Sequence, residues 1–73
     1  MRAYRRVALS RRVVVNTKTG TSLSGVLVEE RGPILILKGA AMLTASANPV
    51  PVDGDVVVER SNVDFVQVLP AEG

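Results

Sequence analysis

The chain has 73 residues, with nine Lys or Arg against seven Asp or Glu, and it contains no Cys and no His. A domain this short buries only about 60% of the surface that its unfolded chain exposes, and this composition excludes disulfides and the usual zinc sites as supports. We therefore expect one small domain that gains stability by self-association, in a reducing cytoplasm or in a particle assembled there.

The sequence predicts neither a membrane segment nor a secretion signal. Its longest unbroken aliphatic run, Ile34 to Leu37, is far too short to cross a bilayer. No apolar stretch of signal-peptide length follows the basic N-terminus. We expect a protein with no membrane partner.

Residues 1–12 form a basic arm with five arginines and no acid, whereas residues 13–73 carry four cations and seven acids, a net charge of −3 (four minus seven). Tyr4, Val7 and Ala8 have helical spacing, which allows one or two turns of helix, with an extended arm as the alternative. Such an arm suits phosphate backbones or an acidic protein surface, although a solvated end is a further interpretation. The arginines predicted to bind a partner are Arg2, Arg5, Arg6, Arg11 and Arg12.

β-Branched residues dominate the apolar runs from residue 13 onward, and turn-forming residues recur at the spacing of a small all-β barrel. The first predicted strand, residues 13–17, closes at Lys18-Thr19-Gly20, and the second covers residues 21–30. Gly25, in the middle of the second strand, allows a strong bend. Residues 31–33 form a turn, and residues 34–38 form a short strand that is covered on both faces.

Residues 39–54 break this pattern. Residues 40–43 are predicted to continue the strand, and residues 46–54 to form an exposed loop. Pro49 and Pro51 stiffen this loop because each fixes its own φ and restricts the preceding residue. The loop is either a docking finger or a connector without a partner.

The last two predicted strands, residues 55–59 and 63–69, are apolar on both faces. In a monomeric barrel they would be edge strands, and an apolar edge is a template for pairing with another copy. We therefore predict a homo-oligomer. The predicted interface residues are Val56, Val57, Val58, Val63, Phe65, Val66 and Val68.

Together these elements predict an all-β fold, a small five-stranded, strongly bent antiparallel barrel over residues 13–69, preceded by the arm and followed by a tail at residues 70–73. The predicted core residues are Val13, Val15, Leu23, Leu27, Leu35 and Phe65.

Residues 12–69 resemble the Sm-like family of ring-forming small barrels, which includes Hfq, through VVVNTKTGTSLSGVL in the first motif and VVVERSNVDFVQVL in the second. In the RNA-binding members, one loop reads a splayed base with an Asn and a second loop carries Arg-Gly. Here Pro33 or Ile34 replaces that Asn, and Ser61 follows Arg60 in the glycine position. The resemblance implies Arg31 and Arg60 as candidate nucleic-acid contacts.

The chain also resembles small structural proteins of tailed phages of actinobacteria, through VALS at residues 7–10, VVVN at 13–16 and PVDGDVVVER at 51–60. This resemblance implies a minor capsid, decoration or head-tail junction component of a virion, docked to other virion proteins through the basic arm. We take it as the first hypothesis, with an Sm-like ring that binds single-stranded RNA as the alternative.

An enzyme is not expected, because the chain has no His or Cys and its paired acids fit no catalytic template. Glu29 and Glu30 are adjacent on a strand, so their side chains face opposite ways. Asp53-Gly54-Asp55 resembles a fragment of a calcium loop but lacks the other ligands. We predict no metal, no cofactor and no catalytic residue.

Overall fold

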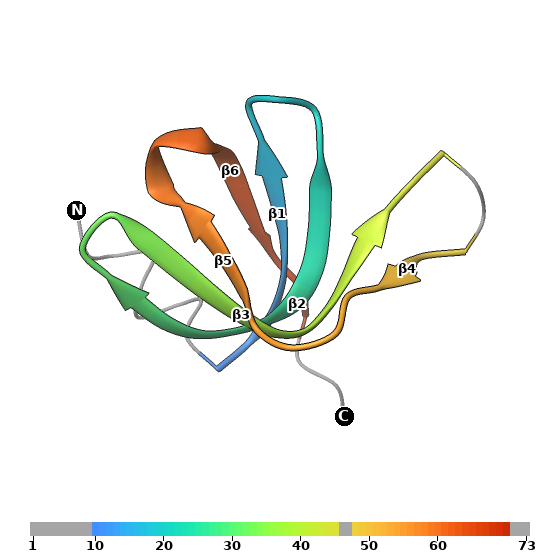
Figure 1. Cartoon of the computed structure of the whole chain (residues 1–73), viewed down its shortest axis with the longest axis horizontal. Helices are drawn as coiled ribbons and strands as arrows, with labels where there is room; N and C mark the ends of the chain where they lie inside the picture. Colours follow the sequence, from blue (N-terminus) through green and yellow to red (C-terminus); the bar gives the residue numbers. More distant parts are fainter. Residues whose placement is uncertain (1–9, 46–47, 71–73) are drawn as a thin grey trace.

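The computed structural model describes residues 10–45 and 48–70, and they form an almost entirely β structure (Figure 1). All strand pairs are antiparallel and the sheet is strongly bent, which confirms the predicted fold class. The elements in chain order are β1 (Arg12–Thr17), β2 (Ser22–Arg31), β3 (Ile34–Leu43), β4 (Val50–Pro51), β5 (Val56–Glu59), the 3-10 helix η1 (Arg60–Asn62) and β6 (Val63–Val68). No helix among these residues has the length and apolarity needed to span a bilayer.

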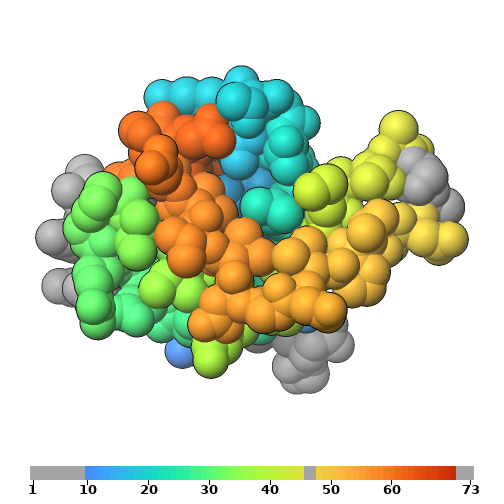
Figure 2. Space-filling model, in the orientation of Figure 1, coloured from blue at the N-terminus to red at the C-terminus, as the bar shows by residue number. Residues whose placement is uncertain are grey.

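The strand order is β4-β3-β2-β1-β6, and β5 also pairs with β3. β3 runs through to Leu43, as the predicted continuation at residues 40–43 requires. Two strands share its outer edge: β5 pairs with residues 34–37 and β4 pairs with residues 41–42. β4 lies inside the segment predicted to be a loop. Together with the second half of β3 it forms a hairpin that stands away from the barrel, here named the distal hairpin (Figures 1 and 2).

The core lies on the concave face of the sheet and follows the two-residue period of its strands. Val13 and Val15 of β1 and Leu27 of β2 are fully buried, and Leu35 and Leu37 of β3 are at most 1% exposed. Leu23 is buried as well, at 8% exposed, so five of the six predicted core residues are confirmed: Val13, Val15, Leu23, Leu27 and Leu35. The partly buried valines that pack against this core come from the last two strands, at Val56, Val63, Val66 and Val68.

Gly25 is buried in β2 and pairs with Val13 of β1, at a point where the register between β2 and β3 shifts. A Cβ added at Gly25 would lie 3.2 Å from the Cα of Ala40 and 3.2 Å from the carbonyl oxygen of Lys38. Both are backbone atoms of β3, which cannot move aside as a flexible side chain can. Glycine at position 25 therefore allows β3 to approach β2 closely.

We expect Gly25→Val to destabilise the barrel by about 1–3 kcal/mol, the usual cost of forcing extra atoms into a packed core. The matched control is Gly32→Val, since an added Cβ at Gly32 meets nothing within 4 Å. Gly32 has a φ of +55°, so this control measures turn strain without a core collision. Urea unfolding checks both variants, and equal losses would show that close packing at Gly25 is not its role.

The fold also corrects the predicted places of three single residues. Phe65 was predicted in the core but is 55% exposed, because its neighbour Val66 takes the inward position on β6. Arg12 was placed in the arm but begins β1 and pairs with Val26. Arg11 also belongs to the barrel, since its Nη2 donates to the carbonyl of Leu69 at 2.8 Å.

Candidate functional site

η1 joins β5 to β6 and ties together the two turns on either side of it. The N–H of Arg60 donates to the carbonyl of Pro33 in the β2–β3 turn at 2.6 Å. At the other end of η1, the carbonyl of Asn62 accepts from the N–H of Lys18 in the β1–β2 turn at 2.7 Å. One end of the barrel is therefore built from three loops whose relative positions are fixed by backbone hydrogen bonds.

Two ion pairs with different burial hold the cations of this loop cluster. The guanidinium of Arg60, whose side chain is 35% exposed, pairs with the carboxylate of Glu30, whose side chain is 1% exposed. Arg31 pairs with Glu29 at 2.7 Å, and both of these side chains are substantially exposed. The buried pair therefore holds Arg60 in place, whereas solvent weakens the surface pair and leaves Arg31 open to competing anions.

The structure thus brings together the loops that carry Arg31 and Arg60, the two candidate nucleic-acid contacts. Pro33 lies exposed in its turn and Ile34 begins β3 half-buried, so neither supplies the amide of a base-reading Asn. Lys18, which sequence reasoning treated only as a turn residue, is an exposed cation beside η1. The cluster offers cations and hydroxyl groups of the kind that contact phosphate and sugar.

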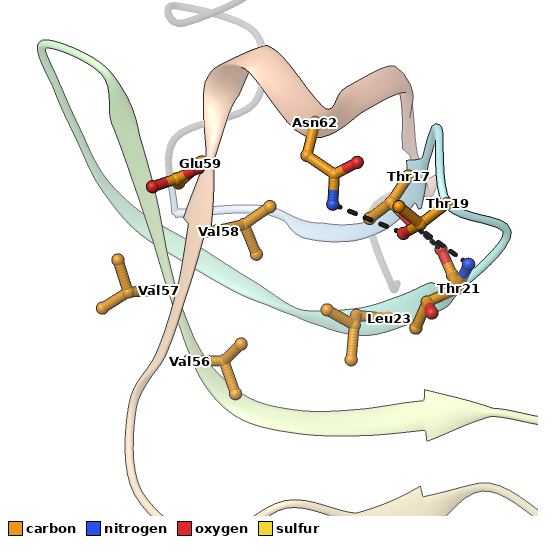
Figure 3. Close-up of a pocket in the computed structure, with 9 residues that line it drawn as sticks. All are labelled: Thr17, Thr19, Thr21, Leu23, Val56, Val57, Val58, Glu59 and Asn62. Carbon is orange, nitrogen blue, oxygen red and sulfur yellow. Dashed lines mark hydrogen bonds between the residues drawn. The ribbon is translucent and has the colours of Figure 1, made fainter.

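A threonine cluster next to η1 was also missed from the sequence. The Thr17 hydroxyl donates to the Thr21 carbonyl at 2.8 Å and lies 3.0 Å from the Thr19 hydroxyl. The Asn62 amide reaches the Thr19 hydroxyl at 3.4 Å (Figure 3). Three threonines alternate around a tight turn in the sequence, and this pattern could have indicated the cluster. It gave no indication that Asn62 would lie opposite these threonines.

These polar groups form one wall of a groove of about 380 Å³ that runs along β5. The apolar wall includes Leu23 and the inward-facing Val56 and Val58, while Val57 points to the other side of β5 (Figure 3). Val57 is 58% exposed. The groove therefore combines an apolar floor with the backbone of an edge strand.

β5 has one free edge. In an antiparallel ladder, every second residue bonds to the partner strand, and the residues between turn their backbone groups to the other side. The bond from Arg60 to Pro33 makes these two residues a hydrogen-bonded pair, and the pairing of Leu35 with Val58 falls two residues further along the ladder. Glu59 lies between these two pairs and Val57 follows on the other side of Val58, so both turn their N–H and C=O groups away from β3. No strand among the described residues pairs with this edge.

β6 has a second free edge. The N–H of Leu69 donates to the carbonyl of Arg12 at 2.9 Å, so the same alternation turns the backbone groups of Val66 and Val68 away from β1. A groove of about 290 Å³, lined in part by Phe65, Val66 and Arg60, lies beside it. Within residues 10–45 and 48–70, β6 thus presents an unpaired edge at one end of the sheet, and β5 presents one beyond β3, at the other end of the sheet, which it shares with β4.

The predicted interface residues divide between two environments. Val58 belongs to the core, and Val56, Val63, Val66 and Val68 pack against it, whereas Val57 and Phe65 expose more than half of their surface. Arg2, Arg5 and Arg6, with the predicted arm or helix, lie outside the described residues. Among the residues described, no group of three or more acidic side chains is placed to hold a metal ion.

No family model matches the chain, and a search of curated proteins finds no relative. Solved structures do match. They include a heptameric archaeal Sm protein, with a TM-score of 0.81 and 23% identity over 93% of this chain and 98% of that one, and the heptameric SmAP1 of P. aerophilum, with a TM-score of 0.81 and 23% identity over 94% and 92%. A third is the Sm protein of Pyrococcus abyssii in complex with a uridine heptamer, with a TM-score of 0.76 and 23% identity over 88% and 90%.

These similarities correct the first functional hypothesis. The chain was interpreted as a structural component of a phage particle, but the three solved structures named above are Sm proteins that match it over nearly the whole length of both chains. The short segments VALS, VVVN and PVDGDVVVER were the basis of the phage hypothesis, and the valines they contain are enriched in strands generally, so they do not distinguish a phage protein. The alternative, an Sm-like ring, fits the comparisons better.

Proposed function

We propose that this chain, which has the Sm-like fold, assembles head to tail into a closed ring that binds single-stranded RNA without catalysing a reaction. The observation that carries the proposal is the pair of unpaired strand edges, on β5 and β6, at opposite ends of one sheet. The loop cluster of η1 and its two turns is the proposed RNA-binding surface.

Two different edges favour a ring over a symmetric dimer. When the edge of β6 joins the edge of β5 on a second copy, each protomer keeps one edge free, so the contact repeats. The repeat ends when the rotation between copies closes the ring, as is consistent with the heptamers among the solved relatives. The groove along β5 would receive the inward-facing valines of the incoming β6.

The loop cluster supports RNA binding through charge. Ring assembly would repeat Lys18 and Arg31 once per protomer, and a circle of such cations attracts a flexible polyanion. One of the solved relatives is a complex with a uridine heptamer. The arginines outside the described residues, Arg2, Arg5 and Arg6, are further proposed phosphate contacts.

We predict that Arg31→Gln weakens binding of a labelled single-stranded oligouridine and flattens its salt dependence. For each phosphate that is no longer neutralised, the slope of log affinity against log salt should fall by about 0.7. Lys38→Gln is the matched control, because it removes one exposed positive charge from β3, where Lys38 lies 3.9 Å from Asp55. Fluorescence anisotropy at several salt concentrations measures both variants.

Equal losses in the two variants would show that net charge, and not the loop cluster, governs RNA binding. If the assembled wild type binds no oligouridine even at low salt, the RNA part of the proposal is wrong. That result would leave ring assembly untouched, because sedimentation and native mass spectrometry test assembly separately.

A further inference from the structure

The end of the sheet beyond β3 presents two edge strands, β4 and β5, and only one of them is suited to accept a partner strand. β4 lies in the distal hairpin, where Met42 is 40% exposed and its cross-strand partner Val50 is 52% exposed. Met42 also pairs with Leu23 of β2, and Leu23 pairs with Val15 of β1. The apolar face of the core therefore extends onto the hairpin and becomes exposed there. An exposed apolar edge of this kind is normally a site of strand addition.

The outer edge of β4 lacks hydrogen-bond donors. The N–H of Val52 donates to the carbonyl of Ala40 at 2.9 Å, so Val52 faces β3, and the alternation places Pro51 with its backbone groups turned outward. Two residues earlier, Pro49 occupies the next outward position. Proline has no N–H, so the outward positions of this edge carry carbonyl groups but no donors.

β5 differs at the equivalent positions. Val57 and Glu59 have outward N–H groups and outward carbonyls, the full set that an antiparallel partner strand needs. Both strands flank the same β3, and both present valine side chains. What distinguishes the two edges is the replacement of outward donors by Pro49 and Pro51.

We propose that Pro49 and Pro51 confine strand addition to β5, so that the β6 of a second copy pairs there and the distal hairpin stays unpaired. This inference rests on the proposed head-to-tail assembly and specifies which edge serves it. Without the prolines, β4 would offer a second acceptor for β6, and closed rings would compete with branched or extended association.

The test introduces donors at both positions with Pro49→Thr/Pro51→Thr, since threonine restores the N–H and suits an edge strand. The control is Val50→Thr, which adds a hydroxyl while its N–H still faces β3. We expect sedimentation velocity to shift from one boundary to a series of faster, concentration-dependent boundaries for the double variant. The control should keep the wild-type boundary.

A second background separates this inference from ring formation itself. In a chain that carries Val57→Pro, the outward donor of β5 is lost, and adding Pro49→Thr/Pro51→Thr should restore association through β4. Restored association would support the role of the prolines even if the wild type forms no ring. Sedimentation unchanged by the two threonines in both backgrounds would overturn it.

Discussion

The single substitution Val57→Pro is expected to convert the assembled protein into a folded monomer. Val57 lies opposite Ile36 at a position whose N–H faces away from β3, so proline there removes no bond of the ladder between β3 and β5. It does remove the central donor of the free edge. The preceding residue, Val56, is already in a strand, the conformation that a following proline requires.

Circular dichroism measures whether the barrel is retained, and sedimentation measures whether assembly is lost. Val57→Thr is the matched control, because threonine has a shape similar to valine and keeps the N–H. We expect the control to assemble like the wild type. Unchanged assembly of Val57→Pro would show that the edge of β5 is not the contact between copies.

The second large effect is expected at the buried ion pair. Arg60→Met leaves the buried carboxylate of Glu30 without its guanidinium. Loss of one partner of a fully buried pair costs about 3–5 kcal/mol, and the partial exposure of Arg60 places this variant at or below the lower end of that range. In a domain of this size that is a large part of the total free energy of unfolding. Urea unfolding at neutral pH measures the loss.

Two further variants test the cause. Glu30→Leu/Arg60→Met removes both charges and should recover most of the stability, because an apolar pair carries no desolvation cost. Arg31→Met breaks the exposed pair with Glu29 and should cost no more than about 1 kcal/mol. If Arg60→Met is as mild as Arg31→Met, the pair of Glu30 and Arg60 contributes no more than a surface pair.

Most of the fold could be predicted because local patterns agree with it. The tight turn at Gly20, the bend at Gly25 and the valine-rich runs placed the strands to within a few residues. The two-residue alternation identified Val13, Val15 and Leu27 as core. Where a strand was missed, as for β4 (Val50–Pro51) in the predicted loop, pairing with a distant segment of β3 decided the outcome.

The burial of Glu30 could not be read from the sequence, because the strand alternation is interrupted there. Leu23 and Leu27 of β2 face the core, but the register with β3 shifts between Leu27 and Glu29, and Glu30 is the buried carboxylate. A similar shift between Asn16 and Thr17 lies beside the start of β6. Bulges of this kind depend on pairing geometry that no single segment encodes.

Only part of the candidate site could be predicted from the sequence, because contacts between distant segments join its loops. The sequence identified Arg31 and Arg60 through their loops, but the link between those loops is a backbone bond from Arg60 to Pro33. Such a bond joins residues far apart in the chain, and it depends on the main chain and not on the side chains. The position of Val57 on a free edge likewise follows from the hydrogen-bond alternation between β5 and β3. That alternation is known only once the register of the two strands is known.

The most direct test of head-to-tail assembly is to mix two variants, each with one blocked edge. Val57→Pro blocks β5, and Val66→Pro blocks β6 because the N–H of Val66 also faces its free edge. Native mass spectrometry should show each variant alone as a monomer and the mixture as a one-to-one dimer, joined through the single remaining pair of edges. A dimer of either variant alone, or a mixture that stays monomeric, would contradict the account.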